Sequence, residues 1–335
     1  MLGLGNRRCA SRAVSWLDVG VIGGATVRYS FATTIVSGWN YPHPIFSYIP
    51  TAAERRPLLA WAHSQGFAGI DVADTWLNWY AMPEPDLREF RDQVKAVGLV
   101  ISGLNPYRCI LARHSSAAQN FEKLKQSVAT CRLLDCHMLN LALSVPFPAD
   151  WSERERAERQ HSLARDRDFS DDDYQRVAEQ LATLADDAAR DGIQLTIELH
   201  DDGMTDTSAG VLRLHRLINR PNVGVNPDLQ NGYRVPYPTE NWRAALLALA
   251  PVTNYWHVKS CSKVYHYDED RSYSLRASLQ DGDIDHRWAL TQLARFGYDG
   301  WIVIESGGGD SLHTAASDRA YMADLVENWL PVVRN

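Results

Sequence analysis

The stretch Gly192-Ile-Gln-Leu-Thr-Ile-Glu198 decides the fold, because its outline recurs along the chain. An amphipathic helical pattern precedes this stretch. The stretch itself begins with a glycine, continues as a short apolar strand and ends at polar residues. The glycine stands where a helix end needs a left-handed residue before the chain turns into a strand. The same outline appears at Gly66-Phe-Ala-Gly-Ile-Asp-Val72, Gly98-Leu-Val-Ile-Ser-Gly103 and Gly297-Tyr-Asp-Gly-Trp-Ile-Val-Ile-Glu305.

Helices separate nearly all of these strands. Apolar residues recur at helical spacing over 87–97 and again over 174–188, where Ser170 and Asp173 form a capping-box pattern. Strands that alternate with helices indicate a parallel sheet with right-handed crossovers. The predicted strands are 27–32, 68–73, 99–104, 138–144, 194–199, 223–226, 254–258 and 301–305.

Eight such strands favour a closed (β/α)₈ TIM barrel, an α/β fold, over an open doubly wound sheet. No compositional break marks a second domain, so one catalytic domain is predicted over 27–335. Residues 1–26 are interpreted as a disordered or flexible leader. Insertions at 146–173 and 261–283 each follow a strand and are therefore expected at the C-terminal face, where barrel enzymes build their active sites.

Composition excludes several classes of protein. The net charge of −7 argues against a nucleic-acid binder, and no apolar run is long enough to span a membrane. The five cysteines include no C-x-x-C pair, which argues against a disulfide framework and makes the cytoplasm the expected location.

Alternate residues of a strand share a face, so each strand can be searched for the groups that it directs at the barrel axis. In the last four predicted strands this search finds an ionisable or metal-binding group near every C-terminal end. The inward sets are Thr196, Glu198 and His200; Gly224, Asn226 and Asp228; Tyr255, His257 and Lys259; and Trp301, Val303 and Glu305.

Glu198, Asp228, His257 and Glu305 would repel one another without a cation. Oxygen ligands with a single nitrogen suit one divalent ion, with Mn²⁺ expected first and Mg²⁺ or Co²⁺ next. Such an ion would polarise a carbonyl while a ligand carboxylate takes a proton from carbon. Separate buried salt bridges or helix caps are the alternative interpretation of each residue taken alone.

These residues in their motifs resemble the xylose-isomerase-like barrel superfamily. The motifs are Ile-Glu198-Leu-His, Val-Gly-Val-Asn-Pro-Asp228, His257-Val-Lys and Trp-Ile-Val-Ile-Glu305. The resemblance implies that the four residues bind the metal and that Glu198 and Glu305 form the acid/base pair. It covers the chain from about residue 27 onward.

The resemblance departs from many epimerases at Asn231, where a histidine is expected. The sequence around it looks closer to the branch of C-glycoside deglycosylase catalytic subunits, in which a small second subunit often completes the site. An oligomer is therefore expected, with a small sugar or glycoside as the ligand. Six residues are predicted to contact this substrate, namely His200, Asn231, Lys259, Trp39, Trp76 and Trp79. The three tryptophans are included because aromatic loops at a barrel mouth suit sugar faces or an aryl group.

The resulting prediction is a metal-dependent carbohydrate enzyme of the sugar isomerase or epimerase type. The alternative is a lyase in which the same proton loss expels a β-substituent, as in a 3-oxo-glycoside deglycosylase or an inosose dehydratase. An abasic-site endonuclease needs a larger metal cluster and a basic surface, and neither is evident in the sequence. A sugar-binding barrel without catalysis remains a third possibility.

Overall fold

The computed structural model describes residues 21–22, 25–40, 49–148, 150–152, 163–236, 240–307 and 309–334. Most of the predicted leader, 1–20 and 23–24, lies outside the described residues. The remainder of it contains two short strands, β1 (Val21–Ile22) and β2 (Ala25–Thr26), which pair antiparallel. None of the described helices combines the length and the apolar character needed to cross a membrane.

Eight parallel strands form the central sheet, in the order β8-β7-β6-β5-β4-β3-β12-β9. A parallel bridge between Val225 and Thr253 links the two ends of this order, so that the sheet is nearly closed. All eight strands were expected from the sequence, and the predicted TIM barrel is confirmed. The strands are β3 (Arg28–Ala32), β4 (Gly69–Ala73), β5 (Val100–Asn105), β6 (Met138–Leu141), β7 (Gln194–Glu198), β8 (Val223–Asn226), β9 (Trp256–Val258) and β12 (Trp301–Ile304).

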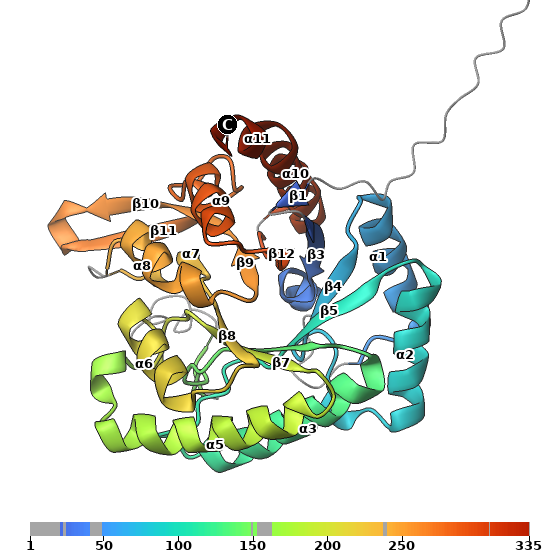
Figure 1. Cartoon of the computed structure of the whole chain (residues 1–335), viewed down its shortest axis with the longest axis horizontal. Helices are drawn as coiled ribbons and strands as arrows, with labels where there is room; N and C mark the ends of the chain where they lie inside the picture. Colours follow the sequence, from blue (N-terminus) through green and yellow to red (C-terminus); the bar gives the residue numbers. More distant parts are fainter. Residues whose placement is uncertain are drawn as a thin grey trace, which may run out of the picture.

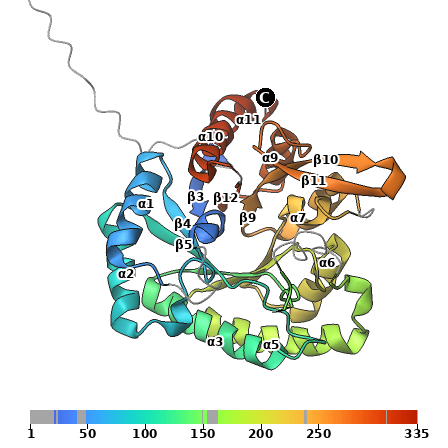
Figure 2. The ribbon, with the colours of Figure 1, turned by 180° about the vertical axis from the view of Figure 1, so that it is seen from behind.

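Helices surround the strands as an outer ring (Figures 1 and 2). The predicted capping box is present, since Ser170 accepts from the Asp173 amide at the start of α5. Gly192 follows that helix with φ of 67°, the left-handed conformation that the sequence pattern required. The helices are α1 (Ala52–Ser64), α2 (Glu84–Ala96), α3 (Ala117–Leu134), α5 (Asp171–Ala189), α6 (Ser208–Ile218), α7 (Leu229–Tyr233), α8 (Trp242–Leu249), α9 (His286–Arg295), α10 (Ser311–Asp324) and α11 (Leu330–Arg334).

Two apolar cores confirm the predicted direction of the strand side chains. The small inner core contains Tyr255, Trp301 and Val303, which were expected to face the barrel axis. The large outer core, between strands and helices, holds the residues that alternate with them, among them Trp256 and Ile302. Strand alternation therefore carries the neighbouring polar residues inward as well.

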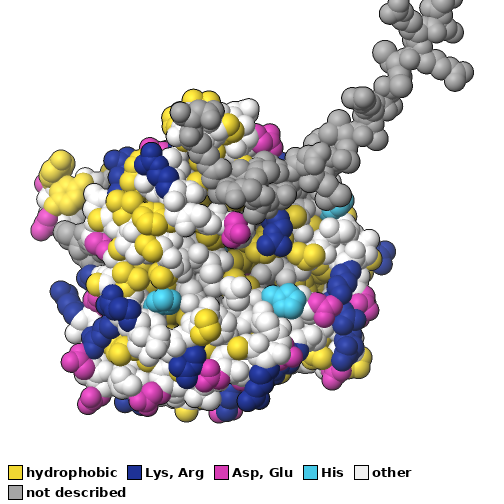
Figure 3. Space-filling model, in the orientation of Figure 1, with side chains coloured by type: hydrophobic (Ala, Val, Ile, Leu, Met, Phe, Trp, Pro, Cys, Tyr) yellow, Lys and Arg dark blue, Asp and Glu magenta, His cyan; other side chains and the backbone are white. Residues whose placement is uncertain are grey.

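The predicted insertion at 261–283 forms a β-hairpin of β10 (Ser260–His266) and β11 (Arg271–Ala277). The hairpin projects from the barrel, and apolar side chains gather at its outer end (Figures 1 and 3). The exposed apolar residues of the hairpin are Val264, Tyr265, Tyr267, Tyr273 and Leu275. The other predicted insertion, 146–173, lies partly outside the described residues and ends within the first turn of α5.

Candidate metal centre and cavity

Four potential metal ligands meet at the C-terminal ends of the barrel strands. Each offers one ligand atom, and these atoms all lie within 4.8 Å of one another. Three of the side chains are buried and the fourth is partly buried. The four come from β7, from the second residue after β8, from the middle of β9 and from the residue after β12. They are Glu198, Asp228, His257 and Glu305, the set expected from the strand register.

Glu198 is held by amide groups on both of its carboxylate oxygens. Asn140 donates from β6 to Oε2 at 2.6 Å, and Asn231 donates from α7 to Oε1 at 2.8 Å. Asn231 also donates to the carbonyl of Leu199 at 3.1 Å. Asn231 was expected to contact substrate, but it is fully buried behind Glu198 and does not line the cavity. Its amide group instead donates hydrogen bonds to Glu198 and Leu199 at the end of β7. Burial raises the pKa of Glu198 to about 8.

His257 is oriented from the inner face of the barrel. Its Nδ1 lies 2.9 Å from Oε2 of Glu305, and its Nε2 lies 3.6 Å from Oδ2 of Asp71. The Tyr255 hydroxyl donates to the same Asp71 oxygen at 2.8 Å, which fixes that carboxylate. A carboxylate beside one imidazole nitrogen favours a proton there and leaves the other nitrogen as a ligand.

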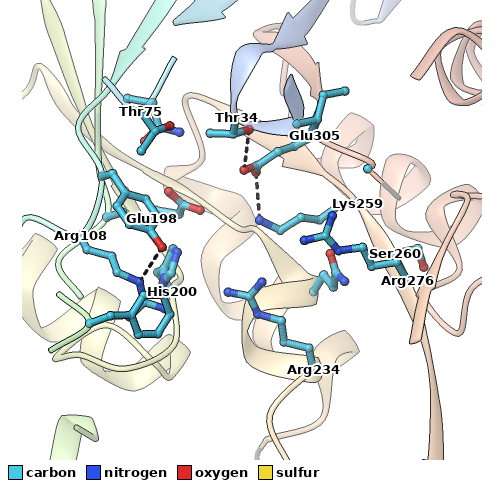
Figure 4. A pocket seen from close by; sticks show the side chains of 17 residues that line it. Thr34, Thr75, Arg108, Glu198, His200, Arg234, Lys259, Ser260, Arg276 and Glu305 are labelled. Carbon is cyan, nitrogen blue, oxygen red and sulfur yellow. Dashed lines mark hydrogen bonds and ion pairs between the residues drawn. The ribbon is translucent and has the colours of Figure 1, made fainter. Parts of the chain in front are cut away.

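Lys259 binds two of the four candidate ligands. Its Nζ lies 2.7 Å from Oδ2 of Asp228. The same Nζ lies 2.9 Å from Oε2 of Glu305, while Thr34 donates to the other Glu305 oxygen at 3.0 Å (Figure 4). Burial alone would raise the pKa of Glu305, but Lys259 and His257 outweigh it and hold that pKa well below its usual range. The two glutamates, Glu198 and Glu305, thus have pKa values displaced in opposite directions, a pattern that is common in pairs of carboxyl groups that act as acid and base.

A cavity of about 400 Å³ opens above this group. Glu198 and Glu305 reach its wall, and so do two of the predicted substrate contacts, His200 and Lys259 (Figure 4). This volume falls within the range of small-molecule sites. The remaining lining residues are Thr34, Ile35, Thr75, Asn105, Tyr107, Arg108, Ala142, Phe147, Gln230, Arg234, Ser260, Arg276 and Gly307.

His200 is held in the cavity wall by its Nδ1. That atom lies 2.7 Å from the Ser144 hydroxyl, which in turn donates to the carbonyl of Asp201 at 2.6 Å. Burial lowers the pKa of His200 to about 3, so the ring is neutral at physiological pH. A neutral ring with Nδ1 engaged in this way is suited to hydrogen-bond a hydroxyl group.

The predicted stacking role of Trp76 and Trp79 is wrong. Both side chains are buried in the outer core and neither lines the cavity. Trp76 packs edge-on against Phe90 of α2 with ring centroids 6.1 Å apart, and Trp79 donates from Nε1 to the Ser127 hydroxyl of α3 at 3.3 Å. Burying a large apolar ring against the helices is more favourable than leaving it at the mouth. The side chain of Trp39 lies outside the described residues.

Sequence reasoning missed several residues of the site. Asp71 shares the inward face of β4 and Asn140 that of β6, so the alternation rule could have found both. Arg108, Arg234 and Arg276 lie outside the eight barrel strands, Arg234 at the end of α7 and Arg276 on β11, and no local pattern distinguishes them from surface arginines.

The family model described as a xylose isomerase-like TIM barrel matches residues 59–325. The chain belongs to that family. No curated protein matches this xylose isomerase-like chain.

Solved structures resemble the xylose isomerase-like barrel over nearly its full length. A xylose isomerase-like TIM barrel protein from Mycobacterium smegmatis, in complex with magnesium, has a TM-score of 0.75 and 22% identity over 91% of this chain and 98% of its own. An L-ribulose 3-epimerase has a TM-score of 0.67 and 16% identity, covering 92% and 97%. The IOLI protein with a bound zinc atom has a TM-score of 0.59 and 15% identity, covering 90% and 99%. At these identities the likeness establishes the fold.

Proposed function

We propose that this protein is a divalent-metal-dependent carbohydrate enzyme of the isomerase or epimerase type, which moves a proton at the carbon next to a sugar carbonyl. The observation that carries the proposal is the convergence of four ligand atoms within 4.8 Å at the floor of a cavity. The structural neighbours support the same assignment, because one is an epimerase, one is in complex with magnesium and one has a bound zinc atom.

The donor set fits a divalent cation. Oδ1 of Asp228 is buried without a hydrogen-bond partner, whereas Oδ2 is paired with the Lys259 ammonium at 2.7 Å. A buried carboxylate oxygen without a partner is costly, and a cation at Oδ1 would relieve that cost. Glu198, His257 and Glu305 would complete the ligand set, which suits Mn²⁺ best among the common ions, with Mg²⁺ or Co²⁺ as alternatives.

The side chains around the cavity supply the remaining chemistry. A bound cation would act as a Lewis acid toward the sugar carbonyl. Glu198 and Glu305 face the cavity and would remove a proton from carbon and return one. The Lys259 ammonium would stabilise negative charge that develops on the carbonyl oxygen, and His200 would orient a substrate hydroxyl.

Elimination from a 3-oxo-glycoside is the second candidate, because it begins with the same loss of a proton. Two of the three tryptophans expected to stack on an aryl group, Trp76 and Trp79, are buried, and the side chain of the third, Trp39, lies outside the described residues. Among the described residues, Phe147 and Tyr107 are the Phe, Tyr or Trp side chains that line the cavity. The arrangement therefore favours isomerisation or epimerisation.

Isotope exchange tests the proposed function. The purified protein, with about one divalent ion per chain, is incubated in D₂O with a panel of ketoses and 3-oxo-glycosides. We expect deuterium at the carbon next to the carbonyl, detected by mass spectrometry, and no release of an aglycone. Chelation should abolish the exchange. Exchange that persists in excess chelator, or a protein with no bound metal by elemental analysis, would contradict the proposal.

Matched histidine variants test the ligand set. His257→Ala should sharply lower metal occupancy, because it removes the single nitrogen ligand of the four candidates found among the described residues. His63→Ala, an exposed site on α1, should leave occupancy unchanged. Equal occupancy in both variants would remove His257 from the proposed centre.

Metal affinity should rise with pH up to about pH 8. Burial raises the pKa of Glu198 to about 8, so below that pH its carboxyl group holds a proton that metal binding must displace. Each pH unit below 8 should therefore weaken the apparent affinity by up to about ten-fold, and the dependence should flatten above it. Calorimetry at pH 6, 7, 8 and 9, in buffers of different ionisation enthalpy, measures both the affinity and the proton release. A Glu198→Gln variant with an unchanged pH dependence would exclude this carboxyl group as the source.

A further inference from the structure

The cavity above the proposed metal centre carries more cationic than anionic side chains. Among the residues that the structure describes, two carboxylates line it, Glu198 and Glu305, and both belong to the candidate ligand set. Four cations line the same space, and Figure 4 shows them arriving from different sides: Arg108, Arg234, Lys259 and Arg276. The metal ligands account for Lys259, whereas the three arginines call for a separate explanation.

Two of these arginines have acidic partners within the wall. Arg108 lies 3.1 Å from Asp202, and Arg234 lies 2.6 Å from Asp201. The Nε of Arg234 is nevertheless buried without a hydrogen-bond partner. Arg276 forms no ion pair with any carboxylate in the described ranges of the chain. Arg234 and Arg276 therefore retain unused capacity to bind an anion.

Arg276 is held over the cavity by the hairpin. It lies on β11 opposite Cys261 of β10, and the returning chain is fixed to β10 by a hydrogen bond from the Asp283 amide to the carbonyl of Cys261, 2.9 Å long. A side chain on Gly307 would place its Cβ 3.4 Å from Nη1 of Arg276, so the guanidinium lies against the loop that follows Glu305. The hairpin thus places the Arg276 guanidinium beside Gly307, which is two positions along the chain from the proposed catalytic residue Glu305.

A glycine makes this placement possible at the base of the hairpin. A Cβ on Gly282 would lie 2.1 Å from the Ser260 hydroxyl oxygen and 2.6 Å from its Cβ. Only glycine permits this approach without displacing Ser260, which itself lines the cavity. The chain that follows β11 is therefore closely packed against the first residue of β10, which holds the base of the hairpin that carries Arg276.

We propose that the substrate carries an anionic group, a carboxylate or a phosphate monoester, which Arg276 and Arg234 bind while the hydroxy-carbonyl end faces the metal centre. This inference rests on the proposed function and specifies its substrate class as acidic sugars or sugar phosphates. The planar guanidinium donates two parallel hydrogen bonds to either group, and such charge-assisted bonds are among the strongest in proteins. Arg234 is partly buried, which reduces the screening that weakens exposed ion pairs, whereas Arg276 is exposed.

Three probes that differ in one group test the inference. Binding of D-fructose, D-fructuronate and D-fructose 6-phosphate to the manganese-loaded full chain is measured by calorimetry. We expect at least one anionic probe to bind about ten-fold or more tightly than D-fructose, the factor that one charge-assisted contact supplies. The preferred probe distinguishes a carboxylate from a phosphate site. Arg276→Gln should remove about ten-fold of the anion affinity and change D-fructose binding by less than about two-fold.

Arg271→Gln is the matched control, because it removes the same charge from the same strand outside the cavity wall. It should leave the anion preference intact, and Arg276→Lys should retain part of it. Equal affinity for the three probes, no binding of either anion at millimolar concentration, or equal losses in Arg271→Gln and Arg276→Gln would overturn the inference.

Isotope exchange in D₂O with the same probes separates this inference from the proposed function. Anion binding that depends on Arg276 but gives no exchange would contradict only the proposed function. Exchange into D-fructose without any anion preference would contradict only the inference.

Discussion

Glu198→Gln and Glu305→Gln are each expected to lower kcat by about 10²–10⁴-fold, the usual contribution of a general acid or base. Each change keeps the size of the side chain and removes the group that transfers the proton. The effect should be large at both positions, because the two carboxylates line the same cavity and have pKa values displaced in opposite directions.

Metal content has to be measured beside kcat for these variants, since both glutamates are also candidate ligands. Turnover at saturating Mn²⁺ separates the loss of the proton-transfer group from the loss of the ion. Glu89→Gln, an exposed change on α2, is the matched control and should retain full activity. If the substitution at Glu198 or Glu305 left kcat nearly unchanged, that residue would be a structural ligand and not a proton-transfer group.

Trp79→Ala is expected to lower the free energy of unfolding by about 3–5 kcal/mol and to leave KM for a sugar nearly unchanged. The indole is fully buried, contacts Tyr80 with ring centroids 5.2 Å apart, and donates to Ser127. Its removal leaves a cavity between the barrel and α3 and takes one hydrogen bond from the Ser127 hydroxyl, which keeps those with the Tyr80 hydroxyl and the Lys123 carbonyl. Denaturant unfolding measures the loss.

Tyr267→Ala is the control for this core substitution. Its side chain, 86% exposed at the turn of the hairpin, should change stability by no more than about 0.5 kcal/mol. If Trp79→Ala raised KM and left the free energy of unfolding unchanged, the prediction would be wrong and Trp79 would belong to the substrate site.

The barrel and its metal-ligand set could be predicted because both follow from local rules. A strand repeats every two residues, so the inward direction of Glu198, His257 and Glu305 is determined once their apolar neighbours are placed outward. Asp228 obeys the same rule just beyond the end of β8. Parallel strands in a closed barrel then bring these positions to one end, without any information from distant parts of the chain.

The aromatic loop after β4 could not be interpreted in this way. Trp76 and Trp79 stand in a segment without periodicity, where composition allows either a sugar platform or core packing. The choice depends on whether α2 and α3 leave a space for each ring, and that space exists only in the folded protein. Asn231 is a similar case, since its role depends on the position of Glu198 across the gap between β7 and α7.

The sequence by itself therefore determined the number of strands, the helices between them and the inward register of the proposed metal ligands, because each depends on spacing along a single segment. Tertiary structure alone decided which loop residues enter the cavity. Arg276 reaches the site only because β10 and β11 pair and Gly282 lets their base pack against Ser260. Contacts of this kind join segments far apart in the chain, and their energies depend on packing that no local pattern encodes.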